Sequence, residues 1–219
     1  MGGGNGAGGP LNQFAAVYSR AYGIAVTKLL GIEGGFVDDR ADRGGATKYG
    51  ISLRFLKSEG AIDANHDGFA DFDLDMDGDI DGADIRRLTI GGAVELYHRC
   101  FWEPLKCESF PAPIGEMLFD QAVNGGKVSA QKLLQRAINA CAVHLPGSPR
   151  VAVDGAIGPV TRGAMMSVIE HPGLGMAALC QAYRDAATAR YRAIVAEDPS
   201  QARFLNGWLA RADSLGRDA

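Results

Sequence analysis

The sequence predicts a mainly α-helical protein, because several segments repeat their apolar residues with the spacing of one helix face. Residues 12–33 form the first such segment, and residues 133–142 and 175–197 form two more. In the first segment the apolar residues are Phe14, Val17, Tyr18, Ala21, Ile24, Ala25, Leu29 and Ile32. The chain has 219 residues, of which 47% are hydrophobic, enough for one large or two small cores.

We expect four parts along the chain. They are a glycine-rich leader (1–11), a first helical domain (12–113), a second helical domain (114–212) and a short tail (213–219). The two prolines of Pro111-Ala112-Pro113 mark the boundary between the domains. The leader lacks the basic and apolar regions of a secretory signal peptide, and we find no apolar run long enough to span a bilayer.

The stretch from Glu33 to Ser52 follows the first predicted helix and holds one Glu, three Asp and five Gly. Glu33 ends the helix, and Asp42 and Thr47 follow on the glycine-rich loop. Glycoside hydrolysis uses an acid on a rigid element with a second carboxylate and a hydroxyl opposite it. A surface carboxylate at a helix end is the structural alternative for Glu33.

Two motifs in this stretch, Glu33-Gly34-Gly35-Phe36 and the segment from Asp42 to Ser52, resemble glycoside hydrolase family 108. Members of that family are peptidoglycan-cleaving muramidases, and many are bacteriophage endolysins. The resemblance implies a lysozyme-like helical domain in which Glu33 is catalytic. The order Glu, Asp, Thr is also similar to phage lysozymes of the T4 type, which implies catalytic roles for Asp42 and Thr47, although Thr47 comes one residue early for that pattern.

Two further residues are candidates for substrate binding. In the family, the segment that contains Tyr49 lines the sugar cleft, although Tyr49 also fits the role of a core aromatic residue. Asn124 belongs to Asn124-Gly125-Gly126, which ends a helix predicted over residues 114–123, and we place it among the substrate-binding residues.

Between these sites the chain predicts two short helices. Ser52 is suited to cap a helix from Leu53 to about Glu59. Gly91-Gly92 begins a second helix that runs to about Phe101, and Pro104 prevents its continuation. Trp102, at the end of that helix, fits either core packing or stacking on a sugar.

Residues 73–84 fit the pattern of an EF-hand-type calcium loop. The oxygen ligands fall at positions 1, 3, 5, 9 and 12, which are Asp73, Asp75, Asp77, Asp81 and Asp84. Gly78 allows the sharp turn, and Asp79 offers its backbone carbonyl. Asp in place of Glu at position 12 is similar to dockerin-type loops. We therefore expect a Ca²⁺ site with a structural or regulatory role and no cofactor for catalysis, the alternative being a solvated acidic loop.

The preceding residues repeat the start of this pattern with Asp63, Asn65, Asp67, Gly68 and Asp71. Position 12 of this first loop is Leu74, whose side chain has no oxygen. The sequence therefore predicts one full site and leaves a partial second site open.

The segment Asp154-Gly155-Ala156-Ile157-Gly158-Pro159-Val160-Thr161 forms a glycine-hinged turn with Pro159 at the first position of a helix. It resembles a motif of the predicted peptidoglycan-binding domain that follows the catalytic domain in family 108. The resemblance as a whole covers residues 12–212 and implies that the second domain binds peptidoglycan.

The net charge, the motifs and the cysteines indicate which partners and metal sites we expect. The net charge is −4, and without the nine aspartates of residues 63–84 it becomes +5, which favours approach to an anionic cell envelope. The chain has neither a phosphate-binding GxxxxGK[ST] motif nor a basic stripe interleaved with aromatics, so we expect no nucleic-acid partner. The four cysteines, Cys100, Cys107, Cys141 and Cys180, form no zinc-type pair and are expected to be free and buried, with a Cys100–Cys107 disulfide left open.

We therefore expect a monomeric N-acetylmuramidase that cleaves the bond between N-acetylmuramic acid and N-acetylglucosamine. We expect it to be made in the cytoplasm and to reach the wall through a holin or a secretion system. Two alternatives remain: a non-catalytic calcium-dependent wall-binding module, and a peptidoglycan amidase or endopeptidase.

Overall fold

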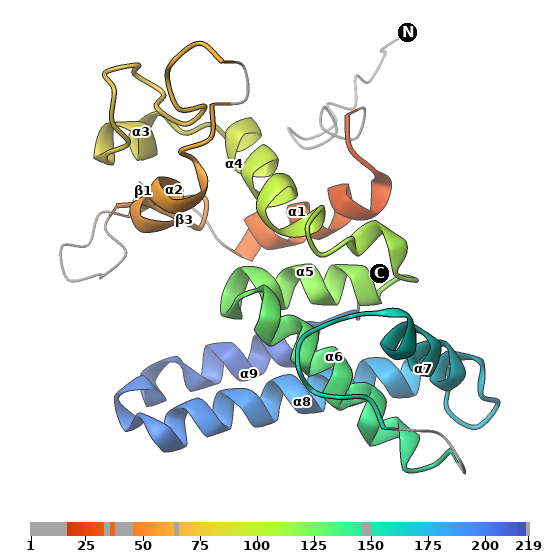
Figure 1. The fold of residues 1–219 in the computed structure, drawn as a ribbon. Coiled ribbons are helices and arrows are strands. Elements are labelled where there is room, and N and C mark those ends of the chain that lie inside the picture. Colours follow the sequence, from red (N-terminus) through yellow and green to blue (C-terminus); the bar gives the residue numbers. More distant parts are fainter. Residues whose placement is uncertain (1–16, 33–35, 38–45, 64–65, 146–149, 218–219) are drawn as a thin grey trace, which may run out of the picture. The chain divides into compact units, whose positions relative to one another are not determined.

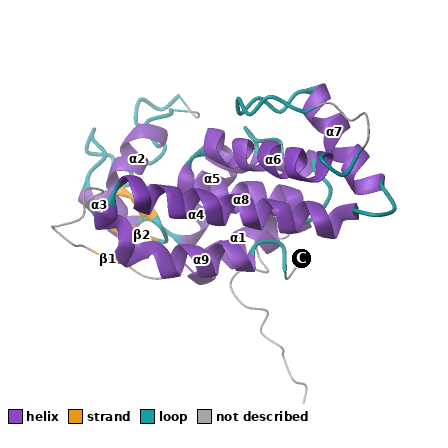
Figure 2. Ribbon diagram, turned by 90° about the horizontal axis from the view of Figure 1, so that it is seen from below, coloured by secondary structure: helices purple, strands orange, loops and turns teal. Residues whose placement is uncertain are grey.

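The computed structural model describes residues 17–32, 36–37, 46–63, 66–145 and 150–217 (Figure 1). The chain forms two compact units, Met1–Pro104 and Leu105–Ala219. The division falls earlier in the chain than the predicted boundary at residues 113 and 114. Helices dominate the described residues and the strands are short, so the mainly α prediction is confirmed (Figure 2). No helix among the described residues is both long and apolar enough to cross a membrane.

The first unit contains short helices and a small antiparallel sheet. Its elements are α1 (Arg20–Ile32), β1 (Phe36–Val37), β2 (Thr47–Lys48), β3 (Ile51–Ser52), α2 (Leu53–Glu59), α3 (Gly82–Arg87), α4 (Ile90–Tyr97) and the π-helical turn η2 (His98–Trp102). The strand order is β1-β2-β3. Tyr49 and Gly50 join β2 to β3 with φ angles of 53° and 75°, so both central residues of this two-residue hairpin turn are left-handed.

The core of the first unit forms where α1 meets α4 and η2. Tyr22 is fully buried, and its hydroxyl donates a hydrogen bond to the Val94 carbonyl oxygen. The ring of Tyr22 lies 5.2 Å from that of Trp102 and 4.7 Å from that of His98, measured between centroids. Trp102 is only 3% exposed, which favours its core-packing alternative.

Local side-chain chemistry accounts for the helix starts in this unit. The Ser52 hydroxyl accepts a hydrogen bond from the Phe55 amide at 3.2 Å and caps α2, as predicted. The Thr89 hydroxyl accepts from the Gly92 amide at 3.0 Å, so α4 begins at Ile90 and not at the glycine pair. The regular helix also ends earlier than predicted, at Tyr97, and η2 continues to Trp102.

The second unit is a helical bundle. Its elements are the 3₁₀ turn η3 (Cys107–Ser109), α5 (Ile114–Gly125), α6 (Lys127–Ala142), α7 (Pro159–Glu170), α8 (Gly175–Glu197), the 3₁₀ turn η4 (Pro199–Phe204) and α9 (Leu205–Ser214). The long helix α8 packs against α6, α7 and α9, and α5 packs against α6. The fully buried Tyr183 of α8 donates a hydrogen bond to the Ala130 carbonyl at 3.1 Å.

Two sequence expectations about this unit have clear outcomes. Helix α5 extends beyond the predicted end at residue 123, and the chain turns at Gly126, whose φ is 86°. Pro159 lies at the first position of α7, as predicted.

In the two units together, all four cysteines are free and buried, which confirms the expectation. Burial raises the pKa of the Cys107 thiol to about 12.

Candidate functional site

Of the three candidate catalytic residues, Glu33 and Asp42 lie outside the described residues, and only Thr47 is described. Helix α1 ends at Ile32, directly before Glu33. Thr47 begins β2, where it pairs with Val37 of β1 and Ser52 of β3. The antiparallel pairing brings the strand that follows Glu33 alongside Thr47. The catalytic roles of all three residues remain predictions.

Tyr49 lies in the hairpin turn directly after β2 and is half-buried. Its carbonyl oxygen accepts a hydrogen bond from the buried Tyr97 hydroxyl at 2.9 Å. The Lys48 ammonium lies 5.4 Å from the centroid of the Tyr49 ring. Tyr49 is thus held by the core without being a fully buried core residue.

A pocket of about 580 Å³ lies beside this turn. The ends of β2 and α3 and the start of α4 form its walls, through Lys48, Tyr49, Arg87, Leu88, Thr89, Ile90 and Gly91. The Lys48 ammonium donates a hydrogen bond to the Arg86 carbonyl at 2.6 Å, which ties the hairpin to the end of α3. Two of the described residues that line it, Lys48 and Arg87, are cationic, and none of the described lining residues is acidic. The pocket is therefore suited to an anionic group.

The other predicted substrate-binding residue, Asn124, belongs to the second unit. It is exposed on α5, and its side-chain amide donates to the Asp120 carbonyl at 2.8 Å. This bond lies within the helix, so its role in substrate binding stays a prediction.

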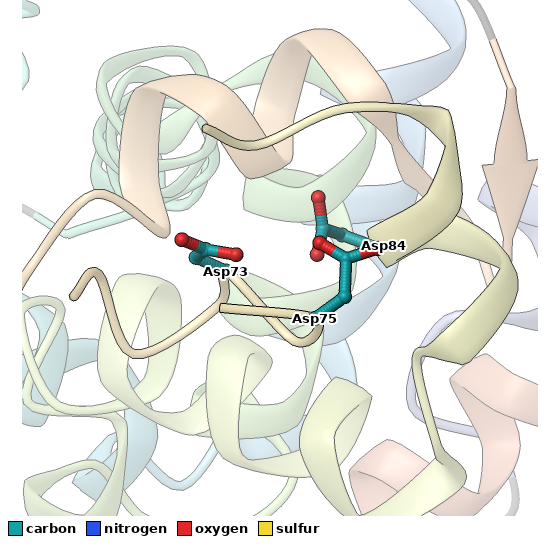
Figure 3. A group of neighbouring side chains, drawn as sticks. All are labelled: Asp73, Asp75 and Asp84. Carbon is teal, nitrogen blue, oxygen red and sulfur yellow. The ribbon is translucent and has the colours of Figure 1, made fainter. Parts of the chain in front are cut away.

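The acidic loop, residues 73–84, brings together three of the six predicted metal-binding residues, which we call the three-aspartate cluster. Asp73, Asp75 and Asp84 each offer a carboxylate oxygen, and these oxygens lie within 4.8 Å of one another (Figure 3). Asp73 is 5% exposed and Asp84 is fully buried. Carboxylates this close and this buried repel one another unless a cation or hydrogen-bond donors compensate their charge.

Backbone amide groups satisfy part of this charge. The two Asp73 carboxylate oxygens accept from the amides of Asp77 and Gly78 at 3.2 and 2.9 Å. Those of Asp84 accept from Leu74 and Asp81 at 2.6 and 2.7 Å. Gly78 has a φ of 100°, and the apolar anchor Ile80 is 8% exposed. The sharp turn at Gly78 agrees with the role that the sequence predicts for this glycine, and the buried Ile80 anchors the loop in the core.

Asp75 has one oxygen without compensation. Its Oδ1 is buried and has no hydrogen-bond partner among the described residues, whereas its Oδ2 lies 3.6 Å from Nη1 of Arg87. Burial, and secondly the neighbouring carboxylate of Asp77, raise the pKa of Asp75 above its ordinary value. Oxygen ligands in a flexible loop are what Ca²⁺ prefers, so the residues present fit that ion.

The remaining predicted metal-binding residues lie at the surface of the loop. Asp77 accepts a hydrogen bond from the Asp79 amide at 3.1 Å, and both residues are exposed. The carboxylate of Asp81, also exposed, caps α3 by accepting from the Ala83 amide. In the described structure these three carboxylates are outside the three-aspartate cluster.

The preceding loop repeats the same local geometry. Asp63 accepts from the amides of Asp67 and Gly68, both at 3.1 Å, and the φ of Gly68 is 93°. Asp71, which corresponds to position 9, forms an ion pair with Arg99 at 2.9 Å. The ion pair gives Asp71 a cationic partner, and Asn65 lies outside the described residues, so the partial second site stays an open prediction.

The glycine-hinged motif of the second unit is held by a residue that the sequence did not single out. Gln135 of α6 is 1% exposed, and its amide nitrogen donates to Asp154 at 2.8 Å. Its amide oxygen accepts from the Gly155 backbone at 2.8 Å. The Ala156 amide and Gln135 hold the pKa of Asp154 below its ordinary value. The only sequence signal for Gln135 is a polar residue on the apolar face of a helix.

Comparisons with known proteins assign two successive regions to the chain, which meet at residues 126–129 and not at the boundary between the two units. Residues 26–126 match the family model described as Glycosyl hydrolase 108, and residues 129–213 match the one described as Predicted Peptidoglycan domain. The solved structure of Brucella abortus SagA is similar in fold, with a TM-score of 0.60 and 21% identity. The match covers 92% of this chain and 99% of that chain. No curated protein matches the chain.

Proposed function

We propose that the chain is an N-acetylmuramidase, because residues 26–126 match glycosyl hydrolase family 108 and residues 129–213 match the predicted peptidoglycan domain. As a peptidoglycan-degrading glycosidase, it would cleave the β-1,4 bond between N-acetylmuramic acid and N-acetylglucosamine. The observation that carries this proposal is the succession of the two families along one chain. It would act at the cell wall as a monomer, after export by a holin or a secretion system.

In this proposal Glu33 is the general acid that protonates the glycosidic oxygen. Asp42, ionised, and Thr47 orient a water molecule or stabilise the charge on the sugar. Two features of the fold support it. Helix α1 ends directly before Glu33, and the β1–β2 pairing places Val37 opposite Thr47.

The acidic loop would hold one calcium ion with a structural role. Asp73, Asp75 and Asp84 supply the buried oxygens, and Asp77, Asp81 and the Asp79 carbonyl complete the set. The support is the unpartnered, buried Oδ1 of Asp75 within the three-aspartate cluster. Bound there, the ion would neutralise the buried carboxylates and hold the loop against α3.

Digestion of purified sacculi in the presence of calcium tests the muramidase. The fragments are reduced with borohydride and identified by mass spectrometry, for the native protein, Glu33→Gln and Glu59→Gln. Glu59 is the matched control, because it is a glutamate at the end of another helix, α2. Reduced muramic acid ends from the native protein and Glu59→Gln, but not from Glu33→Gln, are the expected result.

Other products would point to other activities. Reduced glucosamine ends would identify a glucosaminidase, and new free amino groups would identify an amidase or endopeptidase. Retention on sacculi without cleavage would identify a wall-binding module.

A further inference from the structure

Arg87 belongs both to the acidic loop and to the pocket beside Tyr49. Its Nη1 donates to the Leu74 carbonyl at 3.3 Å and lies 3.6 Å from Oδ2 of Asp75. Arg87 also ends α3 and lines the pocket. Arg87 therefore contacts the start of the loop through its side chain and is also one of the residues that line the pocket.

On the loop side, Arg87 acts on the orientation of Asp75. The guanidinium lies 3.6 Å from Oδ2 and Oδ1 is buried, while one of the two Asp75 oxygens belongs to the cluster with Asp73 and Asp84. Some residues hold the atom of a metal-binding side chain that does not itself contact the metal. Loss of such a residue typically lowers the metal affinity by about 10-fold to 100-fold. Arg87 is thus placed to position Asp75 for the ion.

On the pocket side, Arg87 has donors left for a ligand. Its side chain is 55% exposed. Within the described part of the chain, its contacts with the loop involve only Nη1, so Nε and Nη2 are available. The Lys48 ammonium, with three donors of which one reaches the Arg86 carbonyl, lines the same pocket. An arginine and a lysine that line the same pocket are suited to bind a carboxylate.

We propose that Arg87 couples the two sites: it holds Asp75 for calcium and binds a carboxylate of the peptidoglycan stem peptide in the pocket beside Tyr49. This inference rests on the proposed function, because peptidoglycan supplies the stem peptide. In peptidoglycan the glycan strand consists of sugars, and the attached peptide carries carboxylates. These carboxylates supply the negative charge that Lys48 and Arg87 recognise.

The charges of the loop determine whether calcium strengthens or weakens binding of the carboxylate in the pocket. Without the ion, the carboxylates of the loop repel an incoming carboxylate and attract the guanidinium of Arg87. Calcium neutralises part of that charge, so the pocket binds the anionic ligand more tightly. By linkage, the ligand tightens calcium binding by the same factor, which we expect to be about fivefold.

Isothermal titration calorimetry on the Glu33→Gln protein tests the coupling without turnover. The ligand is a disaccharide-tetrapeptide from peptidoglycan, titrated in saturating calcium and in chelator. Chitotetraose, which has no carboxylate, is the control ligand. Arg87→Gln is compared with Arg86→Gln, because the two changes remove the same charge from neighbouring positions, and Arg86 contacts the hairpin through its backbone carbonyl.

The expected result is that calcium tightens binding of the disaccharide-tetrapeptide about fivefold and leaves chitotetraose unchanged. Arg86→Gln keeps this effect and Arg87→Gln loses it. Arg87→Gln also binds calcium about 10-fold more weakly than Arg86→Gln.

Three results would overturn the proposal: no calcium binding, equal affinities in calcium and chelator, or full coupling in Arg87→Gln. The muramidase is tested separately, by the products of sacculus digestion. A glucosaminidase that shows the coupling would refute the bond assignment alone, and a muramidase without it would refute the role of Arg87 alone.

Discussion

The Tyr97 hydroxyl donates a hydrogen bond to the Tyr49 carbonyl oxygen at 2.9 Å, which joins α4 to the hairpin turn that follows Thr47. Tyr49 has a φ of 53°, a left-handed conformation that non-glycine residues adopt at a cost. Tyr97 is 1% exposed, so it holds this turn from the core. The position of Tyr49 at the pocket thus depends on a side chain far from it in the sequence.

Tyr97→Phe removes this hydrogen bond and keeps the ring. We expect the free energy of unfolding to fall by about 1 kcal/mol, because the Tyr49 carbonyl loses a buried donor. We also expect cleavage of sacculi to slow, since the turn beside the pocket is no longer fixed. Urea unfolding and turnover on the same preparation measure both effects. Unchanged stability would show that water or another donor replaces the hydroxyl.

Calcium should stabilise the first unit through the acidic loop. A ligand that binds only the folded state at 100 times its dissociation constant adds about 2.7 kcal/mol to the free energy of unfolding. We therefore expect the melting temperature to rise with calcium and to fall in chelator. Asp75→Asn should abolish most of this response, because it weakens the ligand whose Oδ1 is unpartnered.

Asp79→Asn is the matched control for that change. It removes the same charge from the same loop, but Asp79 is exposed and contributes its backbone carbonyl to the proposed site. The calcium response of Asp79→Asn should therefore stay close to that of the native protein. An equal loss of response in both variants would mean that the loop binds cations only through its overall charge.

Acid should weaken the second unit at the glycine-hinged motif. Hydrogen bonds from Ala156 and Gln135 hold the pKa of Asp154 below its ordinary value of 3.8. A lowered pKa in the folded state stabilises the fold above the ordinary value, and this stabilisation is lost as the pH falls through the lowered pKa.

Urea unfolding between pH 2.5 and 6 measures the effect. Asp154→Asn should flatten the dependence of stability on pH below 3.8, whereas Asp185→Asn, at an exposed position on α8 of the same unit, should keep it. If stability falls equally with pH in the native protein, Asp154→Asn and Asp185→Asn, the Asp154 contacts do not contribute to the loss of stability in acid.

The sequence was a good guide where a feature depends on neighbours in the chain. Ser52 caps α2 through a residue three positions away, and Pro159 begins α7, because both effects are local. Arg87 and Gln135 could not be predicted in the same way. Their partners Asp75 and Asp154 become neighbours only after the helices pack. The catalytic assignment of Glu33 rests on motif resemblance and remains a prediction.

Two glycines in helices of the second unit should respond to alanine in opposite directions. A Cβ at Gly115 of α5 would clash with the backbone carbonyl oxygen of Cys107, so one segment would have to shift. Such overpacking costs about 1–3 kcal/mol. A Cβ at the exposed Gly163 of α7 would meet no atom within 4 Å.

Gly163→Ala should therefore raise the free energy of unfolding by about 0.5–1 kcal/mol, because alanine loses less backbone entropy on forming a helix. Calorimetric melting of both variants, with the native protein alongside, measures the two shifts. A stabilised Gly115→Ala would mean that the loop at Cys107 moves away from α5 at no cost. In that case the close approach of Gly115 to Cys107 would not limit how η3 packs against α5.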